Sequence, residues 1–297
     1  MAKKCIYKKL PSLSGKTVAI TGSTGGLGRH ICRELISLGA SLVMLNRNAQ
    51  KAAALEDELK AEYPNADISH IKLDLTDIRS VSKAAAELEG ASIDYLILNA
   101  GIFNVPVVKC DTGYNNIFQT NFISQYVLAK AFMPCLKRTN GKIIAVGSLA
   151  HTWAKLDELD TDYSTRKGAG KVYGNSKRFL MAALDELVKI EPSVRFTVAH
   201  PGITLTELTT HYNRFLKAIV KVGMTVLFTP AKRAARNIVA ALFNDTDGEW
   251  IGPRVFGIWG RPSIKKLRTI KPDERARIYE TAEMVCAELA SHGYLTN

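Results

Sequence analysis

Short apolar runs alternate along the chain with longer segments that carry apolar residues at helical spacing. The runs predict strands buried on both faces, and the periodic segments predict amphipathic helices. The predicted strands are residues 18–20, 41–45, 68–73, 94–98, 142–146, 194–199 and 249–252. The predicted helices follow the first strand and then span residues 49–63, 76–88, 113–137, 172–190, 230–243 and 272–290. This alternation predicts an α/β fold in which helices flank a parallel, doubly wound sheet of about seven strands.

The stretch from Thr17 to Leu35 joins a predicted strand to a predicted helix through a glycine-rich turn. Its glycines are Gly22, Gly25, Gly26 and Gly28. Glycine allows positive φ and a close approach of the backbone to a ligand, while the free N–H groups of the first helical turn attract an anion. The turn therefore predicts a cradle for a diphosphate, and a tight turn without a ligand is the alternative.

The second predicted strand ends in Asn46-Arg47-Asn48. In a dinucleotide-binding fold this position reaches the adenosine ribose, where an acidic residue about 20 positions after the glycines binds a free 2′-hydroxyl. That acid is absent here, and the guanidinium of Arg47 suits the 2′-phosphate of NADP. We therefore expect NADP(H) in preference to NAD(H), and a solvated surface arginine is the alternative.

The composition is that of a globular protein with a full core. The chain has 297 residues, of which 46% are hydrophobic and 23% charged, and we interpret residues 1–297 as a single dinucleotide-binding domain. Its net charge of +12 is spread along the chain without a nucleic-acid-binding motif, which argues against a nucleic-acid partner. Its 5 cysteines are scattered and odd in number, so neither a disulfide framework nor a metal site is predicted.

No apolar stretch is long enough for a signal peptide, and none approaches the ~20 residues of a membrane span, so we expect a cytoplasmic protein. Residues 205–229 interrupt the alternation with an apolar segment in which Lys217 and Lys221 share one helical face. We interpret this segment as a lid on the substrate side. The alternatives are an ordinary packed helix and an interfacial helix in peripheral contact with a membrane.

Tyr173 and Lys177 are four residues apart in a predicted helix, so their side chains share one face. A phenol has an ordinary pKa near 10, and a nearby ammonium group favours its ionised form. The pair can therefore act as one proton-transfer device. In isolation, a surface tyrosine beside a solvated lysine is the alternative.

Several short motifs occur together in one order: Thr21-Gly22-x-x-x-Gly26-x-Gly28, Asn99-Ala100-Gly101, Asn121, Ser148, Tyr173-x-x-Ser176-Lys177 and Pro201-Gly202. Together they resemble the short-chain dehydrogenases/reductases, which have a single-domain Rossmann-type fold, and the resemblance covers nearly the whole chain. It implies that Tyr173 is the general acid/base for a substrate carbonyl, whose oxygen Ser148 would hydrogen-bond. Lys177 would hold the nicotinamide ribose and lower the pKa of Tyr173, and Asn121 would help hold a water that links Lys177 to solvent.

The resemblance also implies the cofactor contacts, with Asp74 meeting the adenine. They are Gly22, Ser23, Thr24, Gly26, Leu27, Gly28, Asn46, Arg47, Asn48, Asp74, Leu75, Asn99, Ala100, Gly101, Tyr173, Lys177, Pro201, Gly202, Ile203, Thr204 and Thr206.

Within the family, residues 45–48 and 200–208 and the helical tail are similar to the retinol dehydrogenase and WW-domain-oxidoreductase group. That group acts with NADP(H) or NAD(H) on lipophilic alcohols, aldehydes and ketones. From this sequence we do not expect the hydrophobic N-terminal anchor of many retinol dehydrogenases, and the interval between Ser148 and Tyr173 is longer than in most of the wider family. The substrate-side candidates are His151, Trp153, Tyr212 and Phe215. For His151 and Trp153, a packing role is the alternative.

These observations predict an NADP(H)-dependent oxidoreductase that transfers hydride between nicotinamide and the carbonyl or alcohol of a lipophilic small molecule, such as a retinoid, a steroid or an aromatic ketone. We expect a monomer or a homodimer. A non-catalytic NADP(H)-sensing protein is one alternative, which the complete set of catalytic residue types disfavours. A sugar-nucleotide epimerase is another, which the lack of an acid at Asn46 disfavours.

Overall fold

The computed structural model describes residues 9–103, 105–152, 169–202, 229–244, 249–255, 257, 259–266 and 269–295. Their strands are β1 (Thr17–Thr21), β2 (Ser41–Asn46), β3 (Ile68–Lys72), β4 (Tyr95–Leu98), β5 (Lys142–Val146), β6 (Arg195–Ala199), β7 (Glu249–Val255) and β8 (Trp259–Lys266). Their α-helices are α1 (Gly26–Ser37), α2 (Ala49–Glu62), α3 (Ile78–Ala86), α4 (Asn116–Phe118), α5 (Ser124–Ala131), α6 (Met133–Lys137), α7 (Ala169–Ile190), α9 (Ala231–Ala240) and α10 (Pro272–Ser291).

The strands form one sheet in the order β3-β2-β1-β4-β5-β6-β7-β8. All neighbours are parallel except β7 and β8, so the predicted doubly wound α/β fold is confirmed. The strand order reverses between β1 and β4, and in such sheets ligands bind in the crevice at the carboxyl ends of the strands on either side of this switch point.

The sheet has eight strands instead of the expected seven or so, and β7 extends past Gly252 to Val255. The additional strand is β8, which contains Gly260, Arg261 and Pro262 and lacks an apolar run. Proline and charged residues are tolerated at the edge of a sheet, because one side of an edge strand needs no hydrogen-bond partner. Pairing with β7 therefore forms β8 despite its weak strand pattern.

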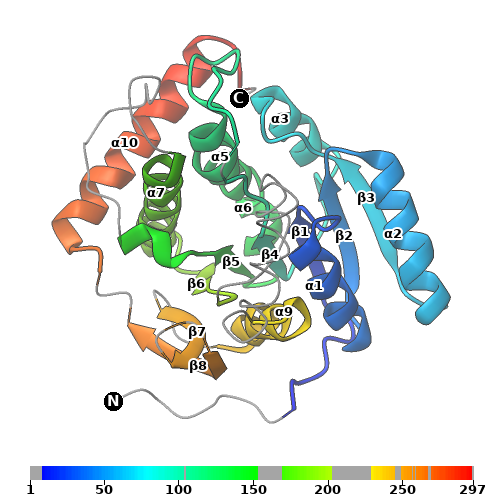
Figure 1. Ribbon diagram of the computed structural model, residues 1–297. Helices are drawn as coiled ribbons and strands as arrows, with labels where there is room; N and C mark the ends of the chain where they lie inside the picture. The colour runs from blue at the N-terminus through cyan, green and yellow to red at the C-terminus, as the bar shows by residue number, and fades with distance from the viewer. Residues whose placement is uncertain are drawn as a thin grey trace, which may run out of the picture.

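Helices cover both faces of the sheet (Figure 1). Apolar residues of α1, α2 and α9 pack on one face together with Val18 and Ile20 of β1. Those of α3, α5, α7 and α10 pack on the other face together with Ala19. Successive side chains of a strand point to opposite faces, so the continuous apolar run of β1 supplies both layers.

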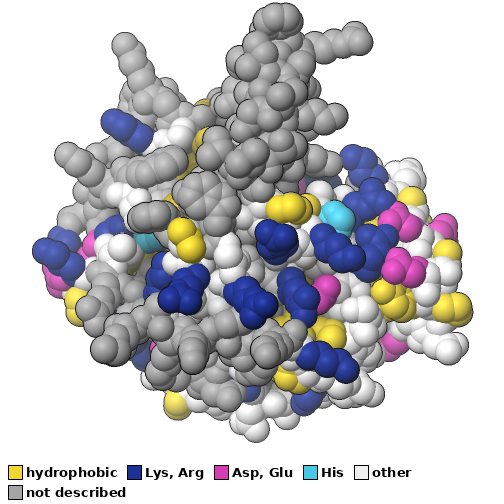
Figure 2. All heavy atoms as spheres, turned by 60° about the horizontal axis from the view of Figure 1, so that its bottom comes forward, with side chains coloured by type: hydrophobic (Ala, Val, Ile, Leu, Met, Phe, Trp, Pro, Cys, Tyr) yellow, Lys and Arg dark blue, Asp and Glu magenta, His cyan; other side chains and the backbone are white. Residues whose placement is uncertain are grey.

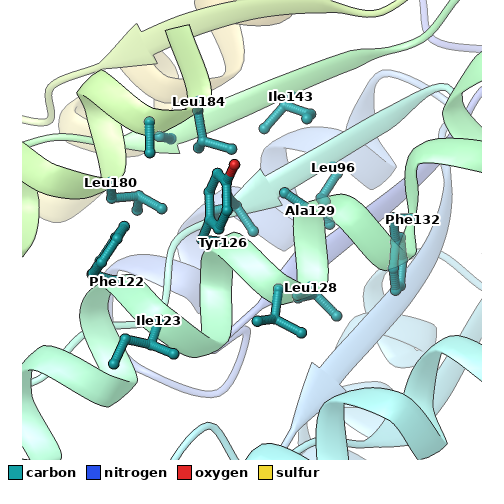
Figure 3. Close-up of a cluster of buried hydrophobic side chains, with 14 of the residues drawn as sticks. Leu96, Phe122, Ile123, Tyr126, Leu128, Ala129, Phe132, Ile143, Leu180 and Leu184 are labelled. Carbon is teal, nitrogen blue, oxygen red and sulfur yellow. The ribbon is translucent and has the colours of Figure 1, made fainter. Parts of the chain in front are cut away.

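The larger core layer orients helix α7. Figure 3 shows Leu180 and Leu184 of α7 facing Tyr126 of α5, with Ile143 of β5 close by, and both leucines are fully buried. Burying a leucine side chain stabilises the fold by about 1.5–3 kcal/mol. Tyr173 and Lys177 lie on the same helical face as the two leucines, two turns and one turn before Leu180 respectively. The packing of the leucines therefore turns that face towards the sheet.

The long helix predicted over residues 113–137 is divided into several shorter pieces. Asn115 caps α4 by accepting the N–H of Phe118, so the helix begins later than expected. A π-helical turn over Gln119–Ile123 separates α4 from α5, and Pro134 lies in the first turn of α6. A π turn widens the helix locally and is frequent at functional sites.

Among the described residues, none of the helices combines the length and apolar character that crossing a bilayer requires.

Candidate active site

The glycine turn after β1 has the geometry of an anion cradle. Gly22 has a φ of +67°, and a Cβ atom built on it would lie 3.0 Å from the Cα of Ala100. A Cβ on Gly28 would lie 2.2 Å from the carbonyl oxygen of Gly22, so only glycine lets α1 pack this closely on the turn. The N-cap of α1 is Gly25, which offers no side-chain bond to the first N–H groups. These groups can therefore bind a phosphate.

The corner after β4 is fixed to the end of β1. The side-chain amide of Asn99 donates to the carbonyl oxygens of Thr21 at 3.0 Å and Gly22 at 3.1 Å. The Thr21 hydroxyl accepts the backbone N–H groups of Asn99 at 3.0 Å and Ala100 at 2.9 Å. These bonds join the two sides of the switch point directly beside the glycine turn.

The three polar residues at the end of β2 have different surroundings. Asn46 is buried, donates from Nδ2 to the Ser23 hydroxyl at 2.6 Å and accepts the N–H of Thr24 at 3.4 Å. This corrects the expectation that Asn46 faces the ribose, because its amide holds the glycine turn. Asn48 caps helix α2 through its side chain. Arg47 is exposed, and within the described part of the chain it has no hydrogen-bond or ion-pair partner.

The end of β3 reaches the same edge of the sheet. Asp74 is half-buried, and its Oδ1 accepts the N–H of Thr76 at 3.0 Å and the Thr76 hydroxyl at 2.7 Å. Leu75 is buried, and its carbonyl oxygen accepts the Ser124 hydroxyl at 2.8 Å. The structure thus brings the predicted residues that follow β1, β2, β3 and β4 to one edge.

Tyr173 and Ser148 lie in contact. The Tyr173 side chain hydrogen-bonds the side chain of Ser148, the second residue after β5. Burial raises the pKa of Tyr173, and the bond with Ser148 opposes this effect only in part. Phe103 packs on the tyrosine ring edge-to-face with centroids 4.8 Å apart. At neutral pH the phenol therefore holds its proton.

Lys177 lies one helical turn after Tyr173 and is buried. Its Nζ donates to the carbonyl oxygen of Val146 at 3.1 Å and lies 5.9 Å from the centroid of the Tyr173 ring. Burial lowers the pKa of Lys177 to about 8. Desolvation of the phenol sets the direction of the shift in the pKa of Tyr173, and the expectation that Lys177 lowers this pKa stays a prediction.

Asn121 occupies the middle of the π-helical turn. Its Oδ1 accepts the N–H of Ile102 at 2.8 Å, and its Nδ2 donates to the Ile102 carbonyl at 2.9 Å and the Ser176 hydroxyl at 3.2 Å. A Cβ on Gly101 would lie 3.2 Å from Asn121 Oδ1 and 3.3 Å from Lys177 Nζ. The glycine of this corner therefore lets Asn121 and Lys177 meet the strand ends.

The end of β6 packs behind the site. Pro201 and Gly202 follow the strand, and Gly202 has a φ of +89°. The preceding His200 is buried, and its Nδ1 lies 3.2 Å from the carbonyl oxygen of Gly147. Burial lowers the pKa of His200 to about 4, so this imidazole is neutral at neutral pH.

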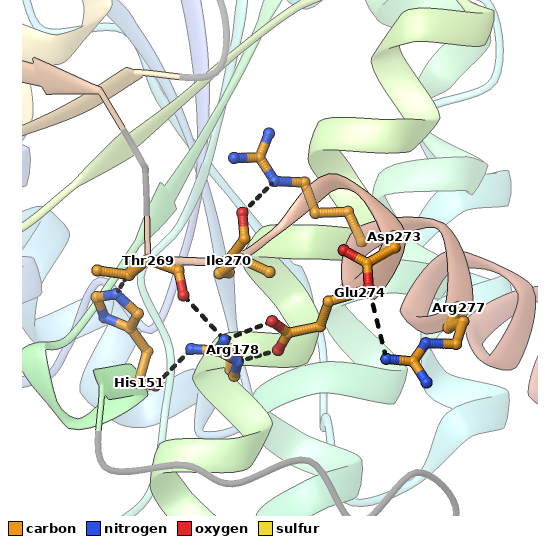
Figure 4. A network of polar contacts seen from close by, with 8 residues as sticks. His151, Arg178, Thr269, Ile270, Asp273, Glu274 and Arg277 are labelled. Atoms are coloured by element: carbon orange, nitrogen blue, oxygen red, sulfur yellow. Dashed lines mark hydrogen bonds and ion pairs between the residues drawn. The ribbon is translucent and has the colours of Figure 1, made fainter.

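His151 belongs to a polar network with Thr269, Arg178 and Glu274 (Figure 4). Its Nδ1 lies 2.6 Å from the carbonyl oxygen of Ser148, and its Nε2 lies 2.7 Å from the Thr269 hydroxyl. Arg178 donates to the carbonyl oxygens of His151 at 3.1 Å and Thr269 at 2.9 Å, and it pairs with Glu274 of α10. This corrects the expectation that His151 contacts a substrate, because both ring nitrogens are already engaged.

Six of the predicted site residues lie outside the described residues, as does most of the expected lid. They are Trp153, Ile203, Thr204, Thr206, Tyr212 and Phe215.

The fold and these motifs match a known family. The family model for short chain dehydrogenase matches residues 16–217. The chain belongs to the short chain dehydrogenase family.

Several oxidoreductases are relatives of this short chain dehydrogenase. Human retinol dehydrogenase 14 is 30% identical over 270 residues, which cover 82% of this chain and 79% of that protein. An uncharacterized oxidoreductase of Schizosaccharomyces pombe is 30% identical over 271 residues, which cover 85% of this chain and 80% of the relative. As a short chain dehydrogenase with such relatives, the protein is an oxidoreductase.

Solved structures share the fold. The crystal structure of an uncharacterized protein from Mycobacterium Paratuberculosis has a TM-score of 0.76 and 26% identity, and the match covers 94% of this chain and 96% of that one. L-sorbose reductase from Gluconobacter frateurii, solved with NADPH and L-sorbose, has a TM-score of 0.61 at 20% identity. The match covers 78% of this short chain dehydrogenase and 90% of the reductase.

Part of this short chain dehydrogenase's site gave no signal in the sequence. Thr269 and Arg178 hydrogen-bond His151, and Glu274 pairs with Arg178. The ring of Trp250 lies against the rings of His151 and His200, with centroids 5.2 and 5.0 Å away. Arg178 and Glu274 are 96 residues apart, so no local spacing links them. An arginine directly after Lys177 in a helix with a buried face was the only available hint.

Proposed function

We propose that the protein is an NADP(H)-dependent oxidoreductase that acts on a carbonyl or alcohol group of a lipophilic substrate, with Tyr173 as general acid/base. The observation that carries this proposal is the hydrogen bond between Tyr173 and Ser148. Lys177 Nζ lies 5.9 Å from the centroid of the Tyr173 ring and also close to Gly101 of the corner after β4. A proton donor and a second hydrogen-bond donor thus converge where one substrate oxygen can bind.

A nicotinamide dinucleotide fits the residues present. Gly22 and Gly28 let the turn pack tightly against Ala100 and the start of α1, and the N-terminus of α1 has neither a side-chain cap nor an acidic residue in its first turn. When bound, the nicotinamide supplies or accepts the hydride. The glycine turn, Asp74 and the Asn99–Gly101 corner would hold the dinucleotide along the carboxyl edge of the sheet.

The protein's own side chains then donate and accept the proton. Tyr173, protonated at neutral pH, donates to the carbonyl oxygen during reduction and takes the proton back during alcohol oxidation. Ser148 donates a second hydrogen bond to the same oxygen as negative charge develops there. Lys177, with a pKa of about 8, can gain or lose a proton near neutral pH and resupply Tyr173. The His151 network holds the Ser148 backbone in place for this task.

The preference for NADP(H) is supported by Arg47. It is exposed at the carboxyl end of β2, and β2 pairs with β1 so that Leu45 lies opposite Thr21, beside the glycine turn. Within the described residues nothing neutralises its guanidinium, which can pair with a 2′-phosphate. The preference for a lipophilic substrate is supported by the retinol dehydrogenases among the relatives.

The decisive experiment replaces the Tyr173 hydroxyl. Tyr173→Phe should lower kcat for carbonyl reduction by at least about 100-fold, the usual contribution of a positioned general acid, while leaving the Kd for NADPH within about threefold. Tyr279→Phe, on helix α10 and outside the proposed site, is the matched control and should keep full activity. A panel of retinoids, steroids and aromatic ketones with both cofactors supplies the substrates.

The same experiment separates the alternatives. If Tyr173→Phe keeps its turnover, the acid/base assignment fails. If the wild-type protein binds NADPH but oxidises or reduces none of the panel, a non-catalytic NADP(H)-sensing protein becomes the better interpretation.

A further inference from the structure

A cavity is lined by residues outside the glycine turn and the Tyr173–Ser148 pair. Its volume is about 560 Å³, and it is formed by helix α9, the start of strand β8 and Leu10 ahead of β1. Arg233 and Asn237 of α9 are four residues apart and line it from one helical face. Arg261 of β8 lines the opposite side. None of these residues belongs to the proposed cofactor or catalytic set.

The cavity carries an excess of positive charge. Three arginines line it, namely Arg233, Arg236 and Arg261, and all three are exposed. Arg236 has Glu34 of α1 at 3.9 Å, whereas Arg233 and Arg261 have no acidic partner in the described ranges of the chain. Figure 2 shows that Lys and Arg side chains gather on this side of the molecule. Arg233 and Arg261 therefore bring two uncompensated like charges to one cavity, and an anion bound between them would reduce their repulsion.

A buried amide at the cavity also lacks a partner. Asn237 is 1% exposed, and its Nδ2 finds no hydrogen-bond acceptor among the residues that the structure describes. Buried polar groups are almost always hydrogen-bonded, so an orphaned amide that lines a cavity indicates a missing acceptor. An anion with several oxygens would supply that acceptor and pair with the arginines at the same time.

We propose that this cavity binds the phosphate group of a phosphate monoester. Guanidinium groups pair with phosphate through two parallel hydrogen bonds, and a phosphate has enough acceptor oxygens to satisfy two arginines and one amide together. Leu10, Ala240 and Pro262 add apolar wall, which suits an organic remainder on the phosphate. The volume lies within the roughly 300–1,000 Å³ of small-molecule sites. The ester is either a free metabolite or a lipid headgroup, which share this chemistry.

The test measures binding of glycerol 3-phosphate by calorimetry to the full chain saturated with NADPH, so that the glycine turn is occupied. Arg233→Gln/Arg261→Gln should weaken binding at least about tenfold, because each lost charge-assisted hydrogen bond accounts for such a factor. Lys9→Gln/Lys232→Gln removes the same charge from two exposed residues near the cavity that do not line it, and should change binding less than about threefold.

Asn237→Asp tests the amide separately, because it keeps the side-chain shape and places a carboxylate against the phosphate. It should also weaken binding at least about tenfold, and thermal unfolding will show whether the variant is folded. If it is not, the exposed arginine pair still decides the matter. Equal losses in the two double variants would mean general charge attraction and would overturn the proposal.

Vesicles distinguish the two sources. Phosphatidylcholine vesicles with and without phosphatidic acid are compared by co-sedimentation. Binding to phosphatidic acid alone, lost in Arg233→Gln/Arg261→Gln, identifies a lipid headgroup, and binding of glycerol 3-phosphate alone identifies a free ester. Binding of neither probe overturns the proposal, as does binding that survives the double arginine substitution. None of these readouts depends on catalytic turnover.

Discussion

Replacing Glu274 by alanine should destabilise the protein far more than replacing its exposed neighbour Asp273 by alanine. Glu274 and Arg178 are both 8% exposed, and their pairing is bidentate, with the second contact at 2.7 Å. Removing one partner of a buried pair leaves the other charge without compensation, which costs about 3–5 kcal/mol. Arg178 would then also hold the carbonyl oxygens of His151 and Thr269 less firmly.

The matched control is Asp273→Ala in the same first turn of α10. Asp273 is 72% exposed and faces Arg277 at 4.0 Å, so its loss should cost at most about 1 kcal/mol. Both carboxylates lie at the same helix N-terminus, so their interaction with the helix dipole is similar in the two variants.

Urea unfolding followed by circular dichroism gives the two free energies of unfolding. Because His151 bonds the Ser148 carbonyl, Glu274→Ala should in addition lower kcat at a temperature where the variant remains folded, with a smaller effect on KM. Equal stabilities of the two variants would refute the interpretation of the Arg178–Glu274 pair as a buried, energetically coupled contact.

Three further predictions follow from the site. Gly28→Ala should reduce NADPH affinity more than about tenfold, because its Cβ would overlap the Gly22 carbonyl oxygen at 2.2 Å. Gly25→Ala should keep the affinity, because the nearest contact of its Cβ would be at 3.5 Å. A fluorescence titration that finds equal losses of affinity in the two variants would contradict the assignment of the glycine turn as a phosphate cradle. Lys177→Met should raise the free energy of unfolding at pH 7 by up to ~3 kcal/mol, because burial lowers the Lys177 pKa from 10.5 to about 8 and so disfavours the charged form. Between about pH 8 and 10.5 the folded wild type binds fewer protons than its unfolded state, so its free energy of unfolding rises with pH there. The difference in free energy of unfolding between Lys177→Met and the wild type should therefore shrink in urea melts across this range. A difference that stays constant would show that the lowered pKa of Lys177 is not its cause. Arg47→Ala should weaken NADPH binding by about 2 kcal/mol and leave NADH binding nearly unchanged, and equal losses by calorimetry would remove the 2′-phosphate assignment.

Local patterns predicted the regular part of the fold. The apolar runs of β1, β2 and β5 fall where the strands form, because a strand covered on both faces must be apolar throughout. The patterns failed for β8 and for the helix over residues 113–137. Tertiary pairing forms β8, and a cap, a π turn and a proline divide the helix.

The residues of the candidate site could be nominated from sequence because each stands at a strand end or on one helical face. Their electrostatic state could not. A tyrosine four residues before a lysine suggests a lowered phenol pKa, yet burial of both side chains decides the outcome and raises the pKa of Tyr173. The roles of Asn46 and His151 depend likewise on neighbours distant in the chain, Ser23 and Thr269.

The sequence by itself thus determined the alternation of elements, the glycine turn and the residue types of the site, since these follow from periodicity and from the backbone freedom of single residues. Only the tertiary structure decided which polar groups are buried, which partners they find and what charge they carry. The physical reason is that desolvation and hydrogen bonding depend on segments that the chain brings together from far apart, such as Arg178 and Glu274 across 96 positions.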